Sequence, residues 1–146
     1  MTKPYQILLV EDNEGDMILT LEALEALNHQ HTIARVKDGE QAIHFLKKEG
    51  DFESAKLPDL ILLDINLPRL DGKEVLAFIK QSKIFKKIPV IILSTSNSER
   101  DVEECYEKGA NCYVVKPSDL DGYVRVIHSI ESFWLNIANL PENLNR

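Results

Sequence analysis

The sequence predicts an α/β fold in which helices cover both faces of a single parallel sheet. Five stretches of helical periodicity alternate with five short apolar runs, at residues 7–10, 33–36, 60–63, 90–93 and 111–115. Apolar runs that are continuous rather than alternating are typical of parallel strands buried on both faces. Right-handed crossovers between such strands place helices on both sides of the sheet, which makes the fold doubly wound.

The first three helices are indicated by apolar residues at helical spacing. Asn13 precedes the first stripe and can cap that helix, because a short polar side chain accepts a hydrogen bond from a free backbone N–H. The apolar positions of the three helices are Met17, Leu21 and Leu24; Ala42, Phe45 and Leu46; and Val75, Ala77, Phe78 and Ile79.

The last two helices are predicted with defined ends. The fourth spans Glu99 to Lys108, and Gly109 follows where a left-handed residue commonly ends a helix. The fifth is expected from Asp119 to about Ala138. Its predicted buried stripe consists of Leu120, Tyr123, Ile127, Ile130, Trp134 and Ile137.

Composition limits the classes of function. The 146 residues suit one domain, predicted over 1–146 with a core at about 6–138 and no output domain. A net charge of −7 disfavours non-specific binding to nucleic acid or to anionic membranes. We expect a cytoplasmic protein with free thiols at Cys105 and Cys112, because the chain shows no apolar leader, no membrane span and no CxxC pair.

Polar side chains follow four of the five predicted strands. Glu11 and Asp12 come after the first strand, Asp64 after the third, Ser94 with Thr95 after the fourth, and Lys116 after the fifth. The carboxyl ends of parallel strands meet at one rim, where ligands of open α/β sheets bind. The strand ends therefore predict one shared pocket.

The acidic residues of this pocket predict a magnesium site. Neighbouring carboxylates resist ionisation together unless a cation neutralises them. Mg²⁺ prefers oxygen ligands and keeps several waters. Glu11, Asp12 and Asp64 are the expected carboxylate ligands, and the backbone carbonyl of Asn66 is the expected fourth protein ligand.

Phosphoryl transfer is the chemistry that uses all of these groups. A carboxylate such as Asp64 can attack phosphorus and form an acyl phosphate. Such transfer requires neutralisation of three equatorial oxygens. Mg²⁺, the Lys116 ammonium and the Ser94 hydroxyl would each take one of them.

Four segments of the chain resemble receiver domains of two-component response regulators. They are Leu8–Asp12, Leu62–Gly72 with its D-x-x-L-P-x-x-D-G pattern, Ile92–Ser94, and Tyr113–Pro117. The resemblance covers about Gln6 to Leu135 and implies a flavodoxin-like sheet of strand order 2-1-3-4-5.

The resemblance also implies residue roles. Asp64 would be the phosphoacceptor, Glu11 and Asp12 the metal-binding acids, and Lys116 the invariant lysine, joined to Pro117 by a cis bond. Ser94 would be the switch hydroxyl, a task that Thr95 could share. Tyr113 would be the switch aromatic, although a packed strand residue explains it equally well. Asp16 could be a further acid that supports the site, but a first-turn helix charge is the preferred interpretation.

A narrower resemblance concerns partners. Glu-Asp-Asn-x-x-Asp after the first strand and the segment Ile130–Leu135 look like single-domain regulators paired with cyanobacterial phytochrome histidine kinases. This implies a phytochrome-type kinase donor, an unknown downstream protein and output by protein contact. The resemblance also favours a homodimer through the face formed by helix 4, strand 5 and helix 5. The chain would be a signalling protein that assists its own phosphorylation and dephosphorylation, not a metabolic enzyme.

Two alternatives use the same residues differently. A haloacid-dehalogenase-like phosphatase also places an Asp nucleophile beside Mg²⁺, but it needs an acid two positions later, where this chain has Asn66. A non-phosphorylated pseudo-receiver would only bind partners. The full set of reactive side chains argues against it.

Overall fold

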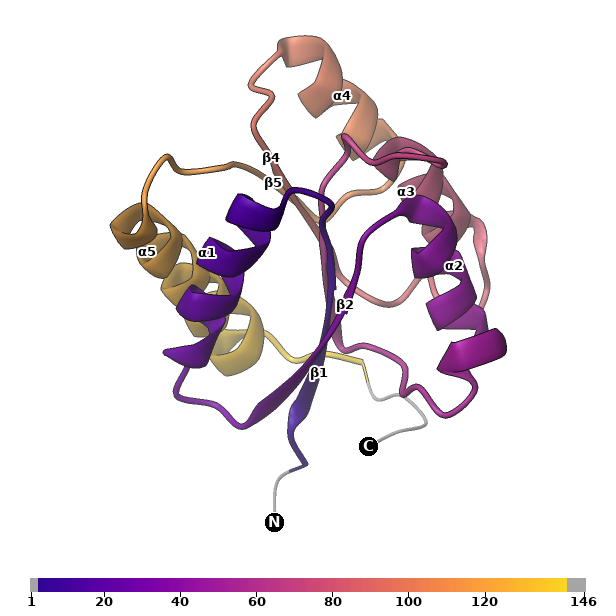
Figure 1. Ribbon diagram of the computed structural model, residues 1–146, viewed down its shortest axis with the longest axis horizontal. Helices are drawn as coiled ribbons and strands as arrows, with labels where there is room; N and C mark the ends of the chain where they lie inside the picture. The colour runs from indigo at the N-terminus through magenta and orange to yellow at the C-terminus, as the bar shows by residue number, and fades with distance from the viewer. Residues whose placement is uncertain (1–2, 142–146) are drawn as a thin grey trace.

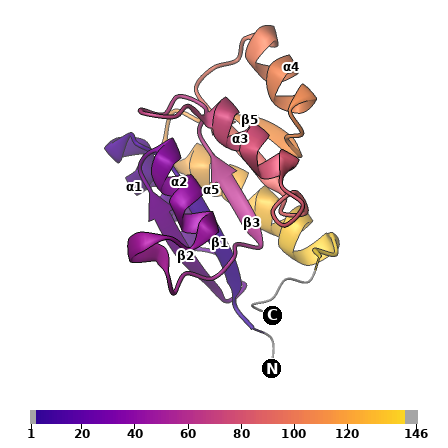
Figure 2. The same ribbon diagram turned by 90° about the vertical axis from the view of Figure 1, so that its right-hand side faces the viewer.

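The computed structural model describes residues 3–141 and contains one five-stranded parallel sheet (Figures 1 and 2). The strand order is β2-β1-β3-β4-β5, and all four neighbouring pairs are parallel. Both the doubly wound prediction and the flavodoxin-like order are therefore confirmed. The strands are β1 (Tyr5–Val10), β2 (His31–Val36), β3 (Leu60–Leu63), β4 (Val90–Ser94) and β5 (Cys112–Val115).

Five helices cover the sheet. In Figure 1, α1 and α5 lie on one side of the sheet, and α2 and α3 lie on the other. Two apolar cores result, one between the sheet and α1 with α5, the other between the sheet and α2, α3 and part of α4. The helices are α1 (Glu14–Glu25), α2 (Gly39–Lys47), α3 (Gly72–Gln81), α4 (Glu99–Glu107) and α5 (Leu120–Ile130), and a short 3-10 turn lies at Gly50–Phe52.

Short polar side chains begin these helices. The Asn13 side chain accepts a hydrogen bond from the backbone N–H of Asp16 at 2.9 Å, so the predicted cap is confirmed. Asp71 and Ser98 cap α3 and α4 in the same way. Gly109 follows α4 with a φ of 103°, the left-handed conformation that glycine adopts without strain.

The fifth helix extends as far as predicted, from the Asp119 cap to Ile137, but it is not a regular α-helix throughout. The α-helix ends at Ile130, and the chain continues as a wider π-helical segment over Glu131–Ile137. The extra residue per turn rotates the following side chains about the helix axis. Glu131 and Leu135 therefore face inward, whereas the predicted stripe residue Ile137 is 68% exposed. Leu120, in the first turn, is 37% exposed.

A buried glutamate begins the π-helical segment. The Glu131 carboxylate accepts hydrogen bonds from the backbone N–H groups of Asn28 and His29, at 2.7 and 2.8 Å, and from the His29 ring at 2.8 Å. These contacts tie the last helical segment to the turn before β2.

Three further observations bear on the sequence predictions. Both cysteines are free thiols. No cis peptide bond occurs in residues 3–141, so the Lys116–Pro117 bond is trans, unlike the bond implied by the resemblance. A trans bond is the state that most X–Pro pairs favour. Within the same residues, no helix has the length and apolar character needed to cross a membrane.

Candidate functional site at the carboxyl ends of the strands

The predicted pocket residues follow strands that lie side by side. Val10 pairs with Leu63 in the β1–β3 register, which puts Glu11 beside Asp64 at the rim. Ser94 pairs with Val115 across β4 and β5, so Lys116 leaves the sheet beside the end of β4. The Lys116 backbone N–H donates to the Ser94 carbonyl at 2.7 Å, which extends the ladder by one bond.

The Lys116 ammonium is the centre of the site. Its Nζ lies 2.7 Å from Glu11 Oε1, 3.0 Å from Asp64 Oδ2 and 2.8 Å from Asp16 Oδ2. Only 3% of the lysine side chain is exposed. An ammonium has three donors, and each of them has a carboxylate partner here.

The negative charge around Lys116 exceeds what one ammonium can neutralise. Burial raises the pKa of Glu11 to about 7, and repulsion from Asp64 adds to this rise although Lys116 opposes it. Burial also works against the charged form of Lys116, but hydrogen bonds to Asp16 and Glu11 hold its pKa above the ordinary value. The pocket therefore gains stability from a further positive charge.

The acidic group fits a divalent cation. One carboxylate oxygen from each of Glu11, Asp12 and Asp64 lies within 4.8 Å of the other two. Glu11 and Asp64 are buried while Asp12 is exposed, so the group has one side open to solvent. Hard oxygen ligands with open positions match the coordination that Mg²⁺ and Mn²⁺ take.

Asn66 lies in the loop that follows Asp64. Its backbone N–H donates to Asp64 Oδ1 at 3.1 Å, while Lys116 holds the other oxygen of that carboxylate. Both oxygens of Asp64 are thus oriented by the protein. The Asn66 carbonyl as a metal ligand stays a prediction.

Gly72 allows α3 to start against the Asp64 backbone. A Cβ on residue 72 would lie 2.2 Å from the Asp64 carbonyl oxygen and 2.4 Å from the Ile65 Cα. In the structure, Asp71 caps α3 and Gly72 permits the close packing that fixes the loop after β3.

The two hydroxyl residues after β4 differ in placement. Ser94 is fully buried, and its Oγ accepts a hydrogen bond from the Ser96 backbone N–H at 3.2 Å. Thr95 is exposed. Successive side chains of an extended chain point to opposite sides, so only one of the two faces the core. This difference favours Ser94 over Thr95 as the switch hydroxyl.

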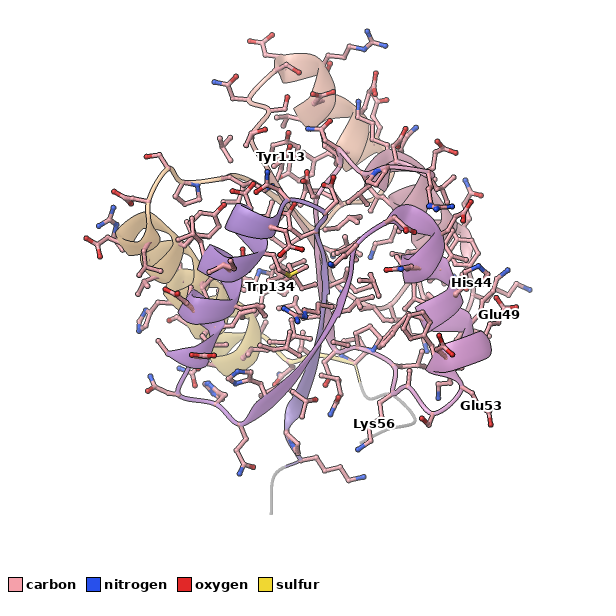
Figure 3. All side chains as sticks on the ribbon, viewed as in Figure 1. His44, Glu49, Glu53, Lys56, Tyr113 and Trp134 are labelled. Atoms are coloured by element: carbon pink, nitrogen blue, oxygen red, sulfur yellow. The ribbon has the colours of Figure 1, made fainter. Side chains whose placement is uncertain are left out.

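Tyr113 contacts the same loop. It lies near the rim of the sheet, below α4 (Figure 3), and its hydroxyl donates to the Ser96 carbonyl at 2.7 Å. The side chain is half-buried. Tyr113 therefore joins β5 to the segment between β4 and α4, in addition to packing against the core.

Asp16 fits both interpretations that the sequence left open. It lies in the first turn of α1, as expected, but its carboxylate contacts Lys116 rather than serving only as a helix charge. Asp16 does not belong to the metal-binding group of Glu11, Asp12 and Asp64. The sequence signal for this contact is the position of Asp16 in the first helical turn after β1, close to the strand ends where Lys116 lies.

Comparisons with known proteins agree with this geometry. Residues 7–128 match the family described as response regulator receiver domain. The response regulator Rcp1 of Synechocystis sp. is 45% identical over 138 residues, which cover 94% of this chain and 94% of the relative.

Two solved structures are similar over nearly their whole length. The Mn²⁺-bound form of response regulator Rcp1 has a TM-score of 0.89 at 45% identity, covering 95% of this chain and 100% of that one. The phosphorylated cyanobacterial phytochrome response regulator RcpA has a TM-score of 0.92 at 44% identity, covering 96% and 100%. With its strand order, its acidic rim and these matches, the chain belongs to the family of response regulator receiver domains.

Proposed function

We propose that this signalling protein accepts a phosphoryl group on Asp64 from a histidine kinase, with Mg²⁺ bound by Glu11, Asp12 and Asp64. The observation that supports this most strongly is the position of Asp64. One of its oxygens lies 3.0 Å from the Lys116 ammonium, and the carboxylate also belongs to the acidic group that fits a divalent cation.

The reaction follows from these contacts. An Asp64 oxygen forms a bond to phosphorus while the bond from phosphorus to the kinase imidazole nitrogen breaks, and the imidazole leaves as the neutral ring after protonation. A bound Mg²⁺ supplies charge neutralisation at one phosphoryl oxygen. Lys116 Nζ and the Ser94 hydroxyl hold the two others.

The proposed switch uses the loop after β4. A phosphoryl group on Asp64 binds Ser94 and draws the loop inward, and Tyr113 follows through its hydrogen bond to Ser96. The surface of α4, β5 and α5 then changes its affinity for a downstream protein. A new charge of about −1.5 to −2 is the trigger, by analogy with other phosphorylated side chains.

A phytochrome-type histidine kinase is the proposed donor. Support comes from RcpA, a phytochrome response regulator of 44% identity that has been crystallised in a phosphorylated form. Rcp1 in its Mn²⁺-bound form supports a divalent ion at the acidic group. We place this phosphotransfer in the cytoplasm, in keeping with the two unpaired cysteines.

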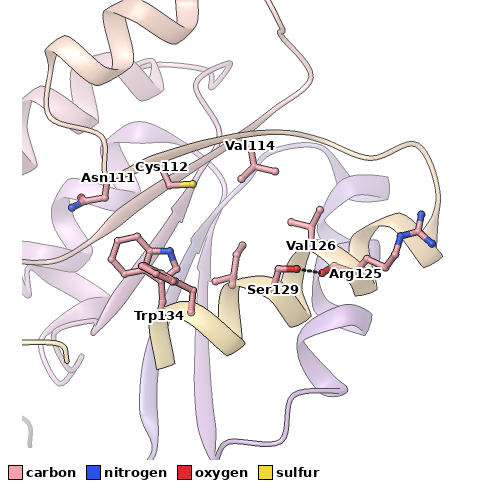
Figure 4. Close-up of a pocket in the computed structure, with 9 residues that line it drawn as sticks. Asn111, Cys112, Val114, Arg125, Val126, Ser129 and Trp134 are labelled. Atoms are coloured by element: carbon pink, nitrogen blue, oxygen red, sulfur yellow. Dashed lines mark hydrogen bonds between the residues drawn. The ribbon is translucent and has the colours of Figure 1, made fainter. Parts of the chain in front are cut away.

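A second copy of the chain is the proposed partner of the α4–β5–α5 face. Tyr106, Val115, Val124 and Phe133 expose large apolar side chains there. Beside them an apolar groove of about 510 Å³ runs between β5 and α5, lined by Cys112, Val114, Val126 and Trp134 among others (Figure 4). Exposed apolar side chains and an apolar groove on one face favour an interface. Phe133→Glu should shift a dimer to monomer in light scattering, whereas an unchanged mass would oppose this assignment.

Phosphotransfer from an autophosphorylated phytochrome-type kinase tests the function. The wild-type chain should take up acid-labile label only with Mg²⁺, Asp64→Asn should take up none, and Asp12→Ala should lose the Mg²⁺ dependence. Equal labelling of Asp64→Asn would contradict the proposal. Repeated turnover of a small phosphate ester would favour the phosphatase alternative, and absence of label with every donor would favour the pseudo-receiver.

A further inference from the structure

A second cluster of charged side chains joins α3 to α4, outside the metal-binding group. Lys73 Nζ of α3 lies 2.6 Å from Asp101 Oδ1 and 2.6 Å from Glu104 Oε2, both of α4. The three side chains are only 21%, 27% and 31% exposed. Arg100 contacts the far side of Glu104 at 2.8 Å and is itself 85% exposed.

The cluster connects to the proposed switch through Ser96. The second oxygen of Asp101 accepts a hydrogen bond from Ser96 Oγ. The Ser96 N–H donates to Ser94 Oγ at 3.2 Å, and the Ser96 carbonyl accepts from Tyr113 at 2.7 Å. Every polar group of Ser96 therefore has a partner, and one of those partners is fixed by Lys73.

The geometry distinguishes this cluster from an ordinary surface ion pair. Isolated exposed pairs contribute little, but a network with short contacts holds its members in one arrangement. Hydrogen bonds from Lys73 and Ser96 lower the pKa of Asp101 to about 2, and those from Arg100 and Lys73 lower that of Glu104 to about 2. The acids thus stay ionised at any physiological pH.

Lys73 and Asp101 lie at the edge of a polar hollow. A polar hollow of about 370 Å³ opens between the loop after β3 and α4, and Lys73 and Asp101 form part of its wall. Asn66 and Asp71 line the same hollow. The Lys73–Asp101 ion pair bridges α3 and α4 at this wall, and Asp101 also contacts Ser96.

We propose that Lys73 and Asp101 are positioning residues for phosphorylation: they hold Ser96 so that the Ser94 hydroxyl faces the phosphoryl site and Tyr113 keeps its acceptor. This inference rests on the proposed function, because it takes Ser94 to be a phosphoryl ligand. It assigns a role to α3 and α4 side chains that touch neither the metal nor the phosphoryl group.

The test measures phosphorylation of Asp64 by a small-molecule donor, acetyl phosphate with Mg²⁺, in the full chain. Lys73→Met should lower the rate roughly tenfold, within the ~10²-fold loss that a displaced group can cause. Lys73→Arg, which keeps the charge, should recover most of the rate. Arg100→Met is the matched control, because it removes a cation from the same region without touching Asp101, and its rate should equal wild type.

A double-mutant cycle separates positioning from general stability. In a Ser94→Ala background, Lys73→Met should cause no further loss, because the hydroxyl that it positions is gone. The Mg²⁺ affinity of Lys73→Met should equal that of wild type. Fluorotyrosine NMR should show the Tyr113 resonance shifted in Lys73→Met and in Asp101→Asn, a variant that preserves the side-chain volume.

The outcomes distinguish the two proposals. If wild type takes up no phosphoryl group at Asp64, the proposed function fails. If wild type is phosphorylated but Lys73→Met reacts at the wild-type rate, or loses as much rate with Ser94→Ala as without it, the positioning role alone is wrong.

Discussion

Two lysines of this molecule are each held by several carboxylates, but the charge around them is balanced differently. Lys116 is surrounded by Glu11, Asp16 and Asp64, so negative charges outnumber positive ones by two. Around Lys73, two acids of α4 face two cations, because Arg100 completes the group, and the charges cancel.

The difference separates a site that needs a ligand from one that does not. Burial raises the pKa of Glu11 to about 7, with repulsion from Asp64 as a smaller cause, so this carboxylate takes up a proton or a cation more readily than an ordinary one. A balanced cluster is satisfied internally, and its acids have pKa values near 2. The first arrangement is suited to chemistry, and the second to holding two helices together.

Removal of the Lys116 ammonium should have the largest effect. Lys116→Met leaves one phosphoryl oxygen without its donor, and we expect a loss of about 10²–10³ in phosphorylation rate. The rate is measured with acetyl phosphate at saturating Mg²⁺. The bound cation also offsets part of the negative charge of the carboxylates that lose their Lys116 partner in this variant. Lys37→Met is the control, because that lysine is 63% exposed. A wild-type rate for Lys116→Met would contradict the role given to the ammonium.

Asp16→Asn should lower the phosphorylation rate less than Lys116→Met does, because Asp16 acts only through its contact with Lys116. The amide still accepts a hydrogen bond but loses the charge, a change of about 1 kcal/mol or roughly fivefold in phosphorylation rate. Mg²⁺ affinity, measured by calorimetry, should stay close to wild type because Asp16 lies outside the metal-binding group. Glu14→Gln, on the same helix turn and 72% exposed, is the control. A large loss of Mg²⁺ affinity would instead make Asp16 a metal ligand.

The two clusters should respond to pH in opposite directions. The raised pKa of Glu11 means that the metal-free fold binds a proton that the unfolded chain releases, so its contribution to stability falls as the pH rises from about 4.5 to 7. Mg²⁺ replaces that proton. Mg²⁺ should therefore raise the melting temperature more at pH 8 than at pH 6, by roughly 3 °C for each ~1 kcal/mol.

The contribution of the Lys73 cluster to folding stability changes with pH in the opposite direction. Asp101 and Glu104 have lowered pKa values, so their contribution is present above the ordinary carboxyl pKa and is lost as the pH falls toward 2. Lys73→Met should flatten this acid limb in thermal melts and leave the Mg²⁺ effect near neutral pH unchanged. An acid limb as steep in Lys73→Met as in wild type would contradict the contribution given to this cluster, and a changed Mg²⁺ effect would show that the two clusters are not independent.

Much of the fold could be predicted from the apolar runs that form the strands. Much of the Lys116 site could be predicted from the residues that follow those strands. Continuous apolar runs place the strands, and a parallel sheet then brings Glu11, Asp64 and Lys116 to one rim without further information. Asp16 was harder, since a first-turn acid has the same appearance whether it only favours the helix or also contacts a lysine.

The Lys73 cluster could not be predicted by the same means. Lys73 is 28 residues from Asp101 and 31 from Glu104, and their contact depends on how α3 and α4 are placed relative to each other. Helical periodicity gives the buried face of each helix but not that placement. Helical periodicity likewise does not give the contact of Glu131, in the π-helical segment after α5, with the backbone N–H groups of Asn28 and His29.

Chemical trapping of the phosphorylated side chain tests the central claim most directly. After phosphotransfer with Mg²⁺, borohydride reduces an aspartyl phosphate to homoserine, and peptide mass spectrometry identifies the modified position. The expected result is homoserine at residue 64 alone, in proportion to the label incorporated. Homoserine at another acidic position, or label without any at residue 64, would contradict the assignment of Asp64 as the phosphoacceptor.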